Sequence, residues 1–398
     1  MTGVDVDATK ISSLSRGEIP IAEPGLGALV AEGLSEGRLA FTTDPDALSR
    51  AEVVVLCVPT PTGPEGATEL RAFDAAVGSL AEVLDPDCVV AVKSTVPVGT
   101  TTRTERLLGR PAVSNPEFLR EGHAVHDFLH PDRIVVGATD PTAADLVTAL
   151  YDGVAAPVLR TDPASAELAK YASNAFLAVK VSYVNVLAEL CERLGADIVD
   201  VARVMGLDPR IGSAFLAPGP GWGGSCLPKD TRALLHTADE AGVDFALLAD
   251  TVAANRHQHE RVVTKVRQAV TGATDGCLDG LRLGLLGLTF KAGTDDVRAS
   301  PALAVATRLA EAGAVLTGYD PGIDRDRVAG VVQVVDDVTL VAKDAAGLVV
   351  LTEWPEFHDL DWALLAALSE RATIVDTRNL LDPELLERAG FAYHGLGR

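Results

Sequence analysis

The chain has 398 residues, enough for two or three domains, and 47% of them are hydrophobic, which suits ordinary packed cores. Its formal net charge of −22 argues against nucleic acid or an anionic membrane as the main partner, because both would repel such a surface. The five cysteines are far apart and form no CxxC pair, which argues against a disulfide framework or a zinc knuckle. No apolar stretch reaches the 18 or more residues of a membrane span. We therefore expect a soluble cytoplasmic protein that meets any anionic substrate with a local cluster of cations.

The amino terminus resembles the second strand of a dinucleotide-binding fold. Residues 2–7 predict the end of a strand, and a helix that carries Lys10 follows. In such folds the acidic residue that ends the second strand binds the adenosine ribose, a position that Asp5 fits. The strand, G-x-G-x-x-G turn and helix that should precede it are missing, and Gly25-Leu26-Gly27 is no substitute because it follows a proline rather than a strand.

We interpret this chain as amino-terminally truncated by a start codon assigned too far downstream. An in-frame upstream sequence that encodes the missing unit would test this hypothesis. Without that unit the first sheet lacks its central strand, so an edge and much apolar surface are exposed. We predict poor binding of a dinucleotide or poor solubility for the 398-residue chain.

Three polar loops each follow an apolar stretch of strand length. They are Pro59–Gly63 after Val53–Val58, Lys93–Thr100 after Val89–Val92, and the segment 114–122 after Val113. Ligands bind at the carboxyl ends of parallel strands, so these loops are candidates for a binding site. Glu117 and Glu121 either belong to that site or form a solvated helix face. His123, His126 and His130 share helical spacing but have no acidic or cysteine partner at ligand spacing, so we predict no metal site.

A long helix is predicted from about residue 164 to 195, and it places Lys170 and Asn174 on one face. This pair either holds a substrate oxygen or is a snorkelling lysine beside a polar neighbour. Helices at about 197–205 and 245–269 complete an α-rich middle segment. Long apolar helices often need a partner to cover them, so the segment also suits a dimer core.

A glycine-rich loop, Gly219–Ser225, ends in a single thiol, Cys226. The loop lets backbone N–H groups approach a bulky ligand without obstruction by Cβ atoms. Pro228 suits the first turn of a helix, so the thiol lies near the positive end of a helix dipole with Lys229 close by. Both influences lower the pKa of a thiol and favour the nucleophilic thiolate. The alternative is a turn beside a buried structural cysteine.

The last third of the chain repeats an α/β pattern. Strands are predicted at 281–286, 315–319, 348–351 and 373–375, with a helix at 301–312. We therefore predict an α/β fold with two doubly wound, Rossmann-like parallel sheets flanking a long central helix and a helical middle domain. The expected domains are an incomplete dinucleotide-binding Rossmann-like domain (1–160), a central helical domain with the cysteine loop and the dimer contacts (161–270), and a second Rossmann-like domain (271–398).

Taken together, these motifs resemble the UDP-glucose/GDP-mannose 6-dehydrogenase family, and the resemblance covers the whole chain. The motifs, in chain order, are Asp5, Val58-Pro59-Thr60-Pro61, Lys93-Ser94-Thr95-Val96-Pro97, Asn115-Pro116-Glu117-Phe118-Leu119, Lys170 with Asn174, Gly223-Gly224-Ser225-Cys226, Lys229-Asp230, Phe290-Lys291 and Asp376-Thr377-Arg378. The Gly-Gly-Ser-Cys motif resembles the UDP-glucose and GDP-mannose branches more than the N-acetylamino-sugar branches.

The resemblance implies an enzyme that oxidises the C6 alcohol of a nucleotide sugar to a carboxylate with two NAD⁺. The expected reaction is UDP-glucose to UDP-glucuronate, which makes uronic acid for polysaccharide biosynthesis, and GDP-mannose is the alternative substrate. Two other functions stay open at this stage. One is a non-catalytic nucleotide-sugar-binding remnant, suggested by the missing glycines. The other is a single-step 2-hydroxyacid-type dehydrogenase, which would have no use for Cys226.

The resemblance also implies a role for each site residue. Catalysis is assigned to Cys226, Lys170, Asn174, Asp230, Thr95 and Glu117. Contacts with the cofactor NAD are assigned to Asp5, Lys10, Thr60, Thr95, Glu121, Lys229 and Arg298. Contacts with the nucleotide sugar are assigned to Glu117, Phe118, Leu119, Arg120, Glu121, Lys170, Asn174, Arg210, Phe215, Leu216, Ala217, Pro218, Gly219, Gly223, Lys291 and Arg378. The other expected partner is a second copy of the chain, in a homodimer or higher homo-oligomer.

Overall fold

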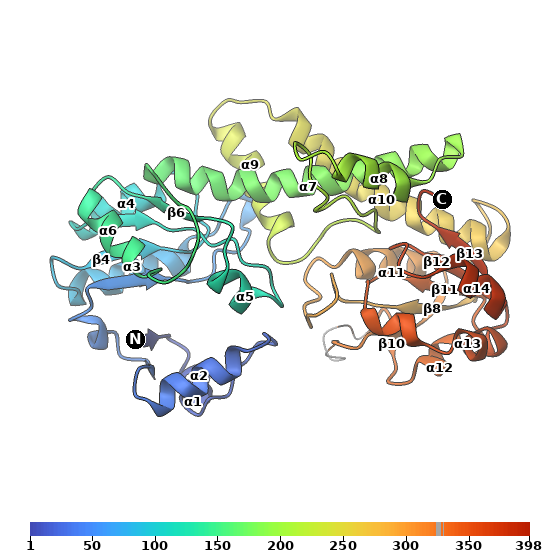
Figure 1. Cartoon of the computed structure of the whole chain (residues 1–398), viewed down its shortest axis with the longest axis horizontal. Coiled ribbons are helices and arrows are strands. Elements are labelled where there is room, and N and C mark those ends of the chain that lie inside the picture. The colour runs from blue at the N-terminus through green and yellow to red at the C-terminus, as the bar shows by residue number, and fades with distance from the viewer. Residues whose placement is uncertain (324–327, 329) are drawn as a thin grey trace. The chain divides into compact units, whose positions relative to one another are not determined.

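The computed structural model describes residues 1–323, 328 and 330–398, which form mixed α/β structure (Figure 1). They divide into two compact units. Unit 1 consists of Met1–Ser173 and Arg232–Asp244, and unit 2 consists of Asn174–Thr231 and Phe245–Arg398. Two helices, α7 (Pro163–Leu194) and α9 (Leu227–Glu240), each contribute residues to both units. The predicted long helix at 164–195 is therefore confirmed.

The main sheet of unit 1 has five strands in the order β3-β4-β5-β6-β7. They are β3 (Val53–Leu56), β4 (Val89–Val92), β5 (Ala112–Ser114), β6 (Ile134–Gly137) and β7 (Val158–Thr161). All pairs are parallel except β5–β6. Successive side chains of a strand point to opposite faces, so Val90 packs with Phe73 of α3 (Arg71–Val83) and Val89 packs with Val147 of α6 (Pro141–Ala149). Both faces are thus covered, as expected for continuous apolar strands.

The described residues of unit 1 also contain six smaller helical elements. They are α1 (Ala8–Ser15), α2 (Leu26–Ser35), η1 (Pro45–Leu48), η2 (Pro64–Gly66), α4 (Thr100–Leu108) and α5 (Ala124–Leu129). The predicted first strand and the helix that carries Lys10 are both present.

Two further strands of unit 1 form a separate sheet. β1 (Thr2–Val4) pairs in parallel with β2 (Ala40–Thr42). Among the described residues, no strand pairs with the outer edge of β3, and its Val55 is 41% exposed. An unpaired edge presents free backbone donors and acceptors, which is the exposed edge that the sequence predicts.

Unit 2 contains a six-stranded parallel sheet in the order β10-β9-β8-β11-β12-β13. Its strands are β8 (Arg282–Leu286), β9 (Val315–Tyr319), β10 (Gln333–Val334), β11 (Gly347–Val350), β12 (Thr373–Asp376) and β13 (Ala392–Gly395). This is the strand order 3-2-1-4-5-6 of a Rossmann fold. The predicted second Rossmann-like sheet is confirmed.

Helices cover both faces of the second sheet. α10 (Ala246–Thr271) and α11 (Pro301–Glu311) pack on one face, where Leu285 contacts their buried side chains. α12 (Val338–Ala342), α13 (Trp362–Leu368) and α14 (Pro383–Ala389) pack on the other, around Leu348. Each fully buried side chain of this size contributes roughly 1.5–3 kcal/mol. The remaining elements of unit 2 are α8 (Ile198–Gly206) and η4 (Pro355–Asp359).

A buried carboxylate closes the turn after β8. Asp320, which follows β9, accepts hydrogen bonds from the backbone N–H groups of Leu288 and Thr289 at 2.6 and 2.9 Å. It also accepts bonds from the Thr289 hydroxyl and the Trp354 indole N–H. In a dinucleotide-binding sheet the first turn offers its backbone N–H groups to a pyrophosphate. Here two of those groups bind a side chain of the protein.

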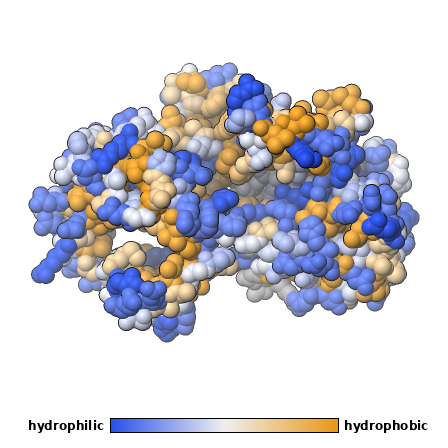
Figure 2. Space-filling view, in the orientation of Figure 1, coloured by the Kyte–Doolittle hydropathy of each residue, from blue (hydrophilic) through white to orange (hydrophobic). Residues whose placement is uncertain are grey.

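Helix α7 is long and apolar enough to cross a membrane by length and composition, a property that the search for apolar runs in the sequence missed. Its polar side chains Lys170, Asn174 and Asn185 are nevertheless buried. All three bind other parts of the protein, as in the core helix of a globular domain. Figure 2 shows apolar patches interspersed with hydrophilic residues over the displayed face.

Candidate active site

The glycine-rich loop is held by two helices of unit 2. The backbone N–H of Trp222 donates to Asn255 Oδ1 on α10, and the Asn255 amide donates back to the Trp222 carbonyl, both at 2.9 Å. The Trp222 indole N–H donates to Ser182 Oγ on α7 at 2.8 Å. These partners are buried, so the bonds fix the backbone just before Cys226.

Glycines in this loop allow backbone segments to approach closely. A Cβ atom on Gly223 would lie 2.0 Å from the carbonyl oxygen of Ala299. Gly224 has φ +84°, and a Cβ atom there would lie 2.8 Å from the Phe290 ring. The loop therefore packs directly against the segment that carries Phe290 and Lys291, two residues of one predicted motif.

The variant Gly223→Ala is expected to be destabilised by about 1–3 kcal/mol or more, because a backbone carbonyl leaves no room for the methyl group. Denaturant unfolding measures the loss. Gly78→Ala on α3 is the matched control, since no atom lies within 4 Å of its Cβ position. That control is expected to gain roughly 0.5–1 kcal/mol. Equal stability of the two variants would contradict the observed packing.

A buried histidine lies behind the loop. His259 of α10 is close to Gly221, where a Cβ atom would lie 2.7 Å from the histidine Nε2. Burial, together with the positive charge of Arg308, lowers the pKa of His259 to about 4. The imidazole is therefore neutral in the folded protein at neutral pH.

His259 is expected to make stability depend on pH between about 6.5 and 4. In this range the unfolded chain binds a proton on His259 that the folded protein does not bind, so stability falls as the pH falls. The expected loss at pH 5 is about 2 kcal/mol relative to pH 7. Urea unfolding at both pH values, for the wild type and for His259→Gln, measures it. The variant should lose less stability on acidification, and an equal loss would contradict the assignment.

Cys226 directly precedes α9, and its side chain is exposed. Its carbonyl accepts the N–H of Asp230 at 2.9 Å, which places the cysteine at the first turn of the helix. Its sulfur lies 3.6 Å from the hydroxyl of Ser225. The predicted position at the positive end of a helix dipole is confirmed. The alternative of a buried structural cysteine is wrong.

Asp230 joins two other predicted catalytic or cofactor residues. Its carboxylate is 1% exposed and accepts the amide of Asn174 at 2.6 Å. It also forms an ion pair with Lys229. A buried carboxylate needs such partners to stay ionised. The structure thus gathers Asn174, Lys229 and Asp230 within unit 2, at the start of the helix that follows Cys226.

Lys170, Glu117 and Phe118 form a second cluster of predicted site residues, in unit 1. Lys170 is 3% exposed, and its ammonium group lies 3.0 Å from Glu117 Oε1. The ammonium also lies 5.2 Å from the centre of the Phe118 ring, whose other neighbouring cation is Arg133 at 3.8 Å. Glu117 lies in a loop rather than on a helix, so the alternative of a solvated helix face is wrong. The other residues of this loop, Leu119, Arg120 and Glu121, complete the predicted substrate segment.

A residue that sequence reasoning missed holds Lys170 in place. Glu167, one turn before Lys170 on α7, accepts the N–H groups of Gly99 and Thr101 at 2.6 and 2.7 Å. It also accepts the Thr101 hydroxyl at 2.7 Å. Burial raises the pKa of Glu167 despite these three bonds. The bonds tie α7 to the start of α4, directly after the loop that carries Thr95. Thr101 and Glu167 are 66 residues apart in the sequence, so no local sequence pattern indicates the role of Glu167.

The predicted cofactor residues of unit 1 lie at strand ends. The Thr60 hydroxyl donates to the Thr95 carbonyl at 2.7 Å and so joins the loops after β3 and β4. Asp5 follows β1 and forms an ion pair with Lys10 at 2.6 Å. Its hydrogen bond from Lys10 lowers the pKa of Asp5. An ionised carboxylate at this strand end fits the ribose-binding role that NAD requires.

The predicted substrate residues of unit 2 divide into two groups. Gly219 and Arg378 are brought together, since a Cβ atom on Gly219 would lie 2.8 Å from the Arg378 guanidinium. In contrast, Arg210 is exposed and forms an ion pair with Asp208. Arg298, which is predicted to contact the cofactor rather than the substrate, forms an ion pair with Asp296. Phe215 has φ +63° and is partly exposed, whereas Leu216 is buried. Ala217 and Pro218 complete the loop that ends at Gly219.

These features define the class of protein. Two sheets of Rossmann type and an acidic residue at the end of a strand indicate a dinucleotide-dependent oxidoreductase. The family models of the UDP-glucose/GDP-mannose dehydrogenase family agree. Residues 1–155 match its NAD binding domain, residues 164–257 its central domain, and residues 284–383 its UDP binding domain.

Relatives match over almost the whole chain. A UDP-glucose 6-dehydrogenase of Rhizobium meliloti (strain 1021) is 44% identical, with 99% of this chain and 93% of the relative covered. The UDP-glucose 6-dehydrogenase TuaD of Bacillus subtilis (strain 168) is 40% identical, with 99% and 87% covered. A solved UDP-glucose dehydrogenase of Pyrobaculum islandicum is 35% identical with a TM-score of 0.90, covering 100% of this chain and 91% of that one.

The chain belongs to the UDP-glucose/GDP-mannose dehydrogenase family. It is an enzyme, and its cofactor is NAD. Its substrate is a nucleotide sugar, as the UDP binding domain indicates. The comparisons do not support the alternative of a non-catalytic remnant.

Proposed function

We propose that this enzyme oxidises the C6 alcohol of UDP-glucose to the carboxylate of UDP-glucuronate through a covalent intermediate on Cys226. The observation that carries the proposal is the exposed thiol at the start of α9, one helical turn before the buried Asp230 that binds Asn174. The names of the relatives support UDP-glucose as the sugar.

The reaction removes four electrons from the alcohol. NAD⁺, when bound, accepts one hydride in each of two oxidation steps, so two NADH form per sugar. The first step leaves an aldehyde, and the Cys226 sulfur adds to its carbonyl carbon to give a thiohemiacetal. Loss of a second hydride and a proton gives a thioester. Water then adds to the thioester carbonyl, the C–S bond breaks, and the departing Cys226 thiolate takes up a proton from that water as the acid is released.

The residues of each cluster have a role in these steps. Asn174 donates an amide N–H to the oxygen that becomes negative when the sulfur adds. Lys170 supplies a positive charge for the same purpose, four residues away on α7. Asp230 accepts the proton of the water that cleaves the thioester, and Thr95 and Glu117 keep the role in hydrolysis that the resemblance implies. The guanidinium of Arg378 engages the diphosphate, which suits its paired donors.

The test is an NADH-release assay with UDP-glucose and with GDP-mannose. We expect UDP-glucose to give two NADH per sugar consumed and GDP-mannose to react much more slowly. The same assay with a 2-hydroxyacid is the control for the single-step alternative, which would give one NADH. Release of one NADH per UDP-glucose, with an aldehyde as product, would refute the proposed covalent route.

We also propose that the protein is a homodimer whose interface includes one face of α7. Three exposed aromatic and aliphatic side chains, Phe176, Tyr183 and Leu190, repeat every seven residues and so share this face. Phe176 alone is 63% exposed. Light scattering should give twice the chain mass for the wild type. Tyr183→Glu combined with Leu190→Glu should give the monomer mass.

Two further assignments belong to this proposal. We assign NAD binding to residues 1–160, the central domain to residues 161–270 and UDP-sugar binding to residues 271–398. This assignment is supported by the three family models, which match residues 1–155, 164–257 and 284–383. The cytoplasm is the proposed location, because all five cysteines are free thiols, a state that a reducing compartment maintains.

A further inference from the structure

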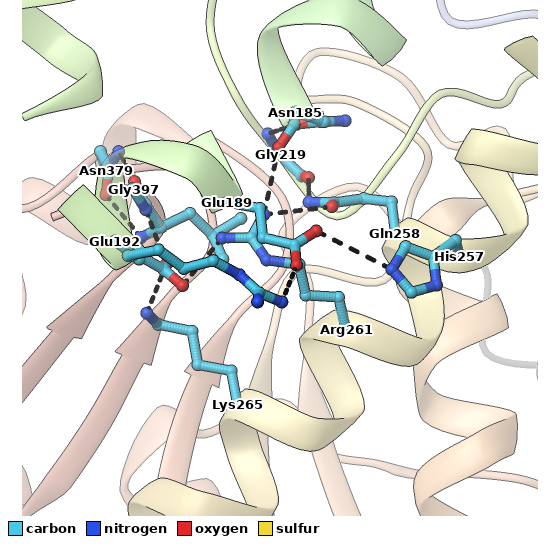
Figure 3. A network of polar contacts seen from close by, with 12 residues as sticks. Asn185, Glu189, Glu192, Gly219, His257, Gln258, Arg261, Lys265, Asn379 and Gly397 are labelled. Carbon is cyan, nitrogen blue, oxygen red and sulfur yellow. Dashed lines mark hydrogen bonds and ion pairs between the residues drawn. The ribbon is translucent and has the colours of Figure 1, made fainter. Parts of the chain in front are cut away.

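A network of buried and half-buried polar side chains in unit 2 connects the carboxyl-terminal tail to the loop that ends at Gly219 (Figure 3). We name it the Glu192 network, and its members are Asn185, Glu192, Gln258, Arg261, Lys265 and Gly397. It comprises residues from α7, α10 and the tail after β13. No predicted site residue belongs to it, and nothing in the proposed chemistry uses its charges.

Two amide side chains of the network bind the backbone of Gly219, one at its N–H and the other at its carbonyl. The Gly219 N–H donates to Asn185 Oδ1 at 2.9 Å. The Gly219 carbonyl accepts from Gln258 Nε2 at 2.7 Å. Gln258 is only 4% exposed, so water cannot readily replace this bond. The orientation of the Gly219 backbone is therefore set by these two amides.

Arg261 contacts the side-chain amide of Gln258 and the backbone carbonyl of Asn185. One of its terminal nitrogens donates to the Asn185 carbonyl at 3.2 Å and to Gln258 Oε1 at 3.3 Å. Because Gln258 Oε1 accepts from Arg261, its amide nitrogen points toward Gly219. The other terminal nitrogen of Arg261 lies 2.9 Å from Glu192. An arginine fork can make all of these bonds at once, which a lysine cannot.

Glu192 connects this arrangement to the end of the chain. Its carboxylate binds Lys265 at 2.7 Å and accepts the N–H of Gly397 at 2.8 Å. Burial opposes ionisation of Glu192, but the bonds from Lys265, Gly397 and Arg261 outweigh it and lower the pKa of this carboxyl. It therefore carries a negative charge at neutral pH and holds the tail against α7 and α10.

The tail leads back to Arg378. The side chain of Asn379, next to Arg378, bonds with both the N–H and the carbonyl of Leu396, at 3.0 and 2.8 Å. The Arg378 guanidinium in turn packs on Gly219 and is held by Glu353 at 3.0 Å. Two separate chains of contacts therefore converge on the pair formed by Gly219 and Arg378.

We infer that Gln258, oriented by Arg261 and Glu192, is a positioning residue. It fixes the orientation of the Gly219 backbone and thereby the position of Arg378, which binds the diphosphate of the nucleotide sugar. This inference rests on the proposed function, in which these two residues contact that substrate. Gln258 itself touches neither substrate nor cofactor. Its effect is on sugar binding rather than on hydride transfer.

Gln258→Glu is the main test, because it preserves size and shape but replaces the donor to Gly219 with an oxygen. When this carboxyl is ionised, it repels the Gly219 carbonyl. We expect the KM for UDP-glucose at pH 8 to rise roughly tenfold to a hundredfold while the KM for NAD and kcat stay within about twofold. As the pH is lowered, the carboxyl gains a proton, can donate again, and the KM for UDP-glucose should recover toward the wild-type value.

Glu192→Gln is the second variant, and it weakens the same network from the far end. It should raise the KM for UDP-glucose by a smaller factor and without the recovery at low pH. Gln268→Glu is the matched control, since it makes the same change at an exposed position of α10. It should leave all three constants unchanged. Circular dichroism melting shows whether each variant is folded.

The outcomes separate this inference from the proposed function. If the wild type oxidises no nucleotide sugar, the proposed function fails. If the wild type is active but folded Gln258→Glu and Glu192→Gln keep its KM for UDP-glucose, the positioning role is wrong. An equal rise of both KM values would also overturn it, because that result indicates general loosening of the fold.

Discussion

Cys226→Ser is expected to lose uronic acid formation by a factor on the order of 10³ or more. A serine hydroxyl is a far weaker nucleophile than a thiolate at neutral pH, so the aldehyde is not captured for the second oxidation. Chromatographic quantification of the UDP-glucuronate formed measures the loss. Intact-protein mass spectrometry of the wild type, quenched during turnover, should show a covalent adduct that the variant lacks.

The control for this result is Cys277→Ser. Cys277 is also an exposed free cysteine of unit 2, but it follows α10 and lies outside the glycine-rich loop. It should retain wild-type activity. Uronic acid formation by Cys226→Ser at the wild-type rate would contradict the covalent route and leave the cysteine a structural role only.

Lys170→Met is expected to lower kcat by about 10²–10³, with a smaller change in the KM for either substrate. The methionine roughly preserves the length of the side chain but removes the buried positive charge that faces Glu117. In the proposed mechanism, that charge stabilises the developing negative oxygen in both the addition and the hydrolysis steps. Steady-state kinetics separates the two constants.

Two further variants show whether the effect of Lys170→Met is chemical. Lys343→Met removes an exposed lysine at the end of α12 and should change nothing. Glu117→Gln retains Lys170 but removes its ion-pair partner, so it should reduce the rate of thioester hydrolysis more than that of the first oxidation. If Lys170→Met raised only KM, the lysine would be a binding residue and not part of the chemistry.

The sequence predicts the sheets and long helices well because they depend on local patterns. Val53–Leu56 and Val89–Val92 are uninterrupted apolar runs bounded by turn residues, which is typical of buried parallel strands. The two-residue strand β10 and the antiparallel pairing of β5 with β6 carry no such pattern. Direction and pairing depend on partners that are distant in the sequence.

The candidate site shows the same limit. Cys226 and Asp230 are recognisable because they lie in one short motif. Glu167 and Gln258 are ordinary helix residues in the sequence, and only the folded structure shows that they hold the start of α4 at Thr101 and the loop at Gly219. Arg210 is predicted to reach the substrate. In the structure, however, its guanidinium forms an ion pair with Asp208, and its backbone N–H donates to the same carboxylate. Its contact with substrate stays a prediction.

The carboxylate of Asp320 has a consequence for ligand selection within this chain. A second sheet of dinucleotide-binding topology could bind NAD in place of the nucleotide sugar. Because Leu288 and Thr289 already donate to Asp320, an incoming pyrophosphate would find those donors occupied and a negative charge beside them. Duplicated architecture is thus compatible with two distinct ligands, and a single acidic side chain discriminates between them.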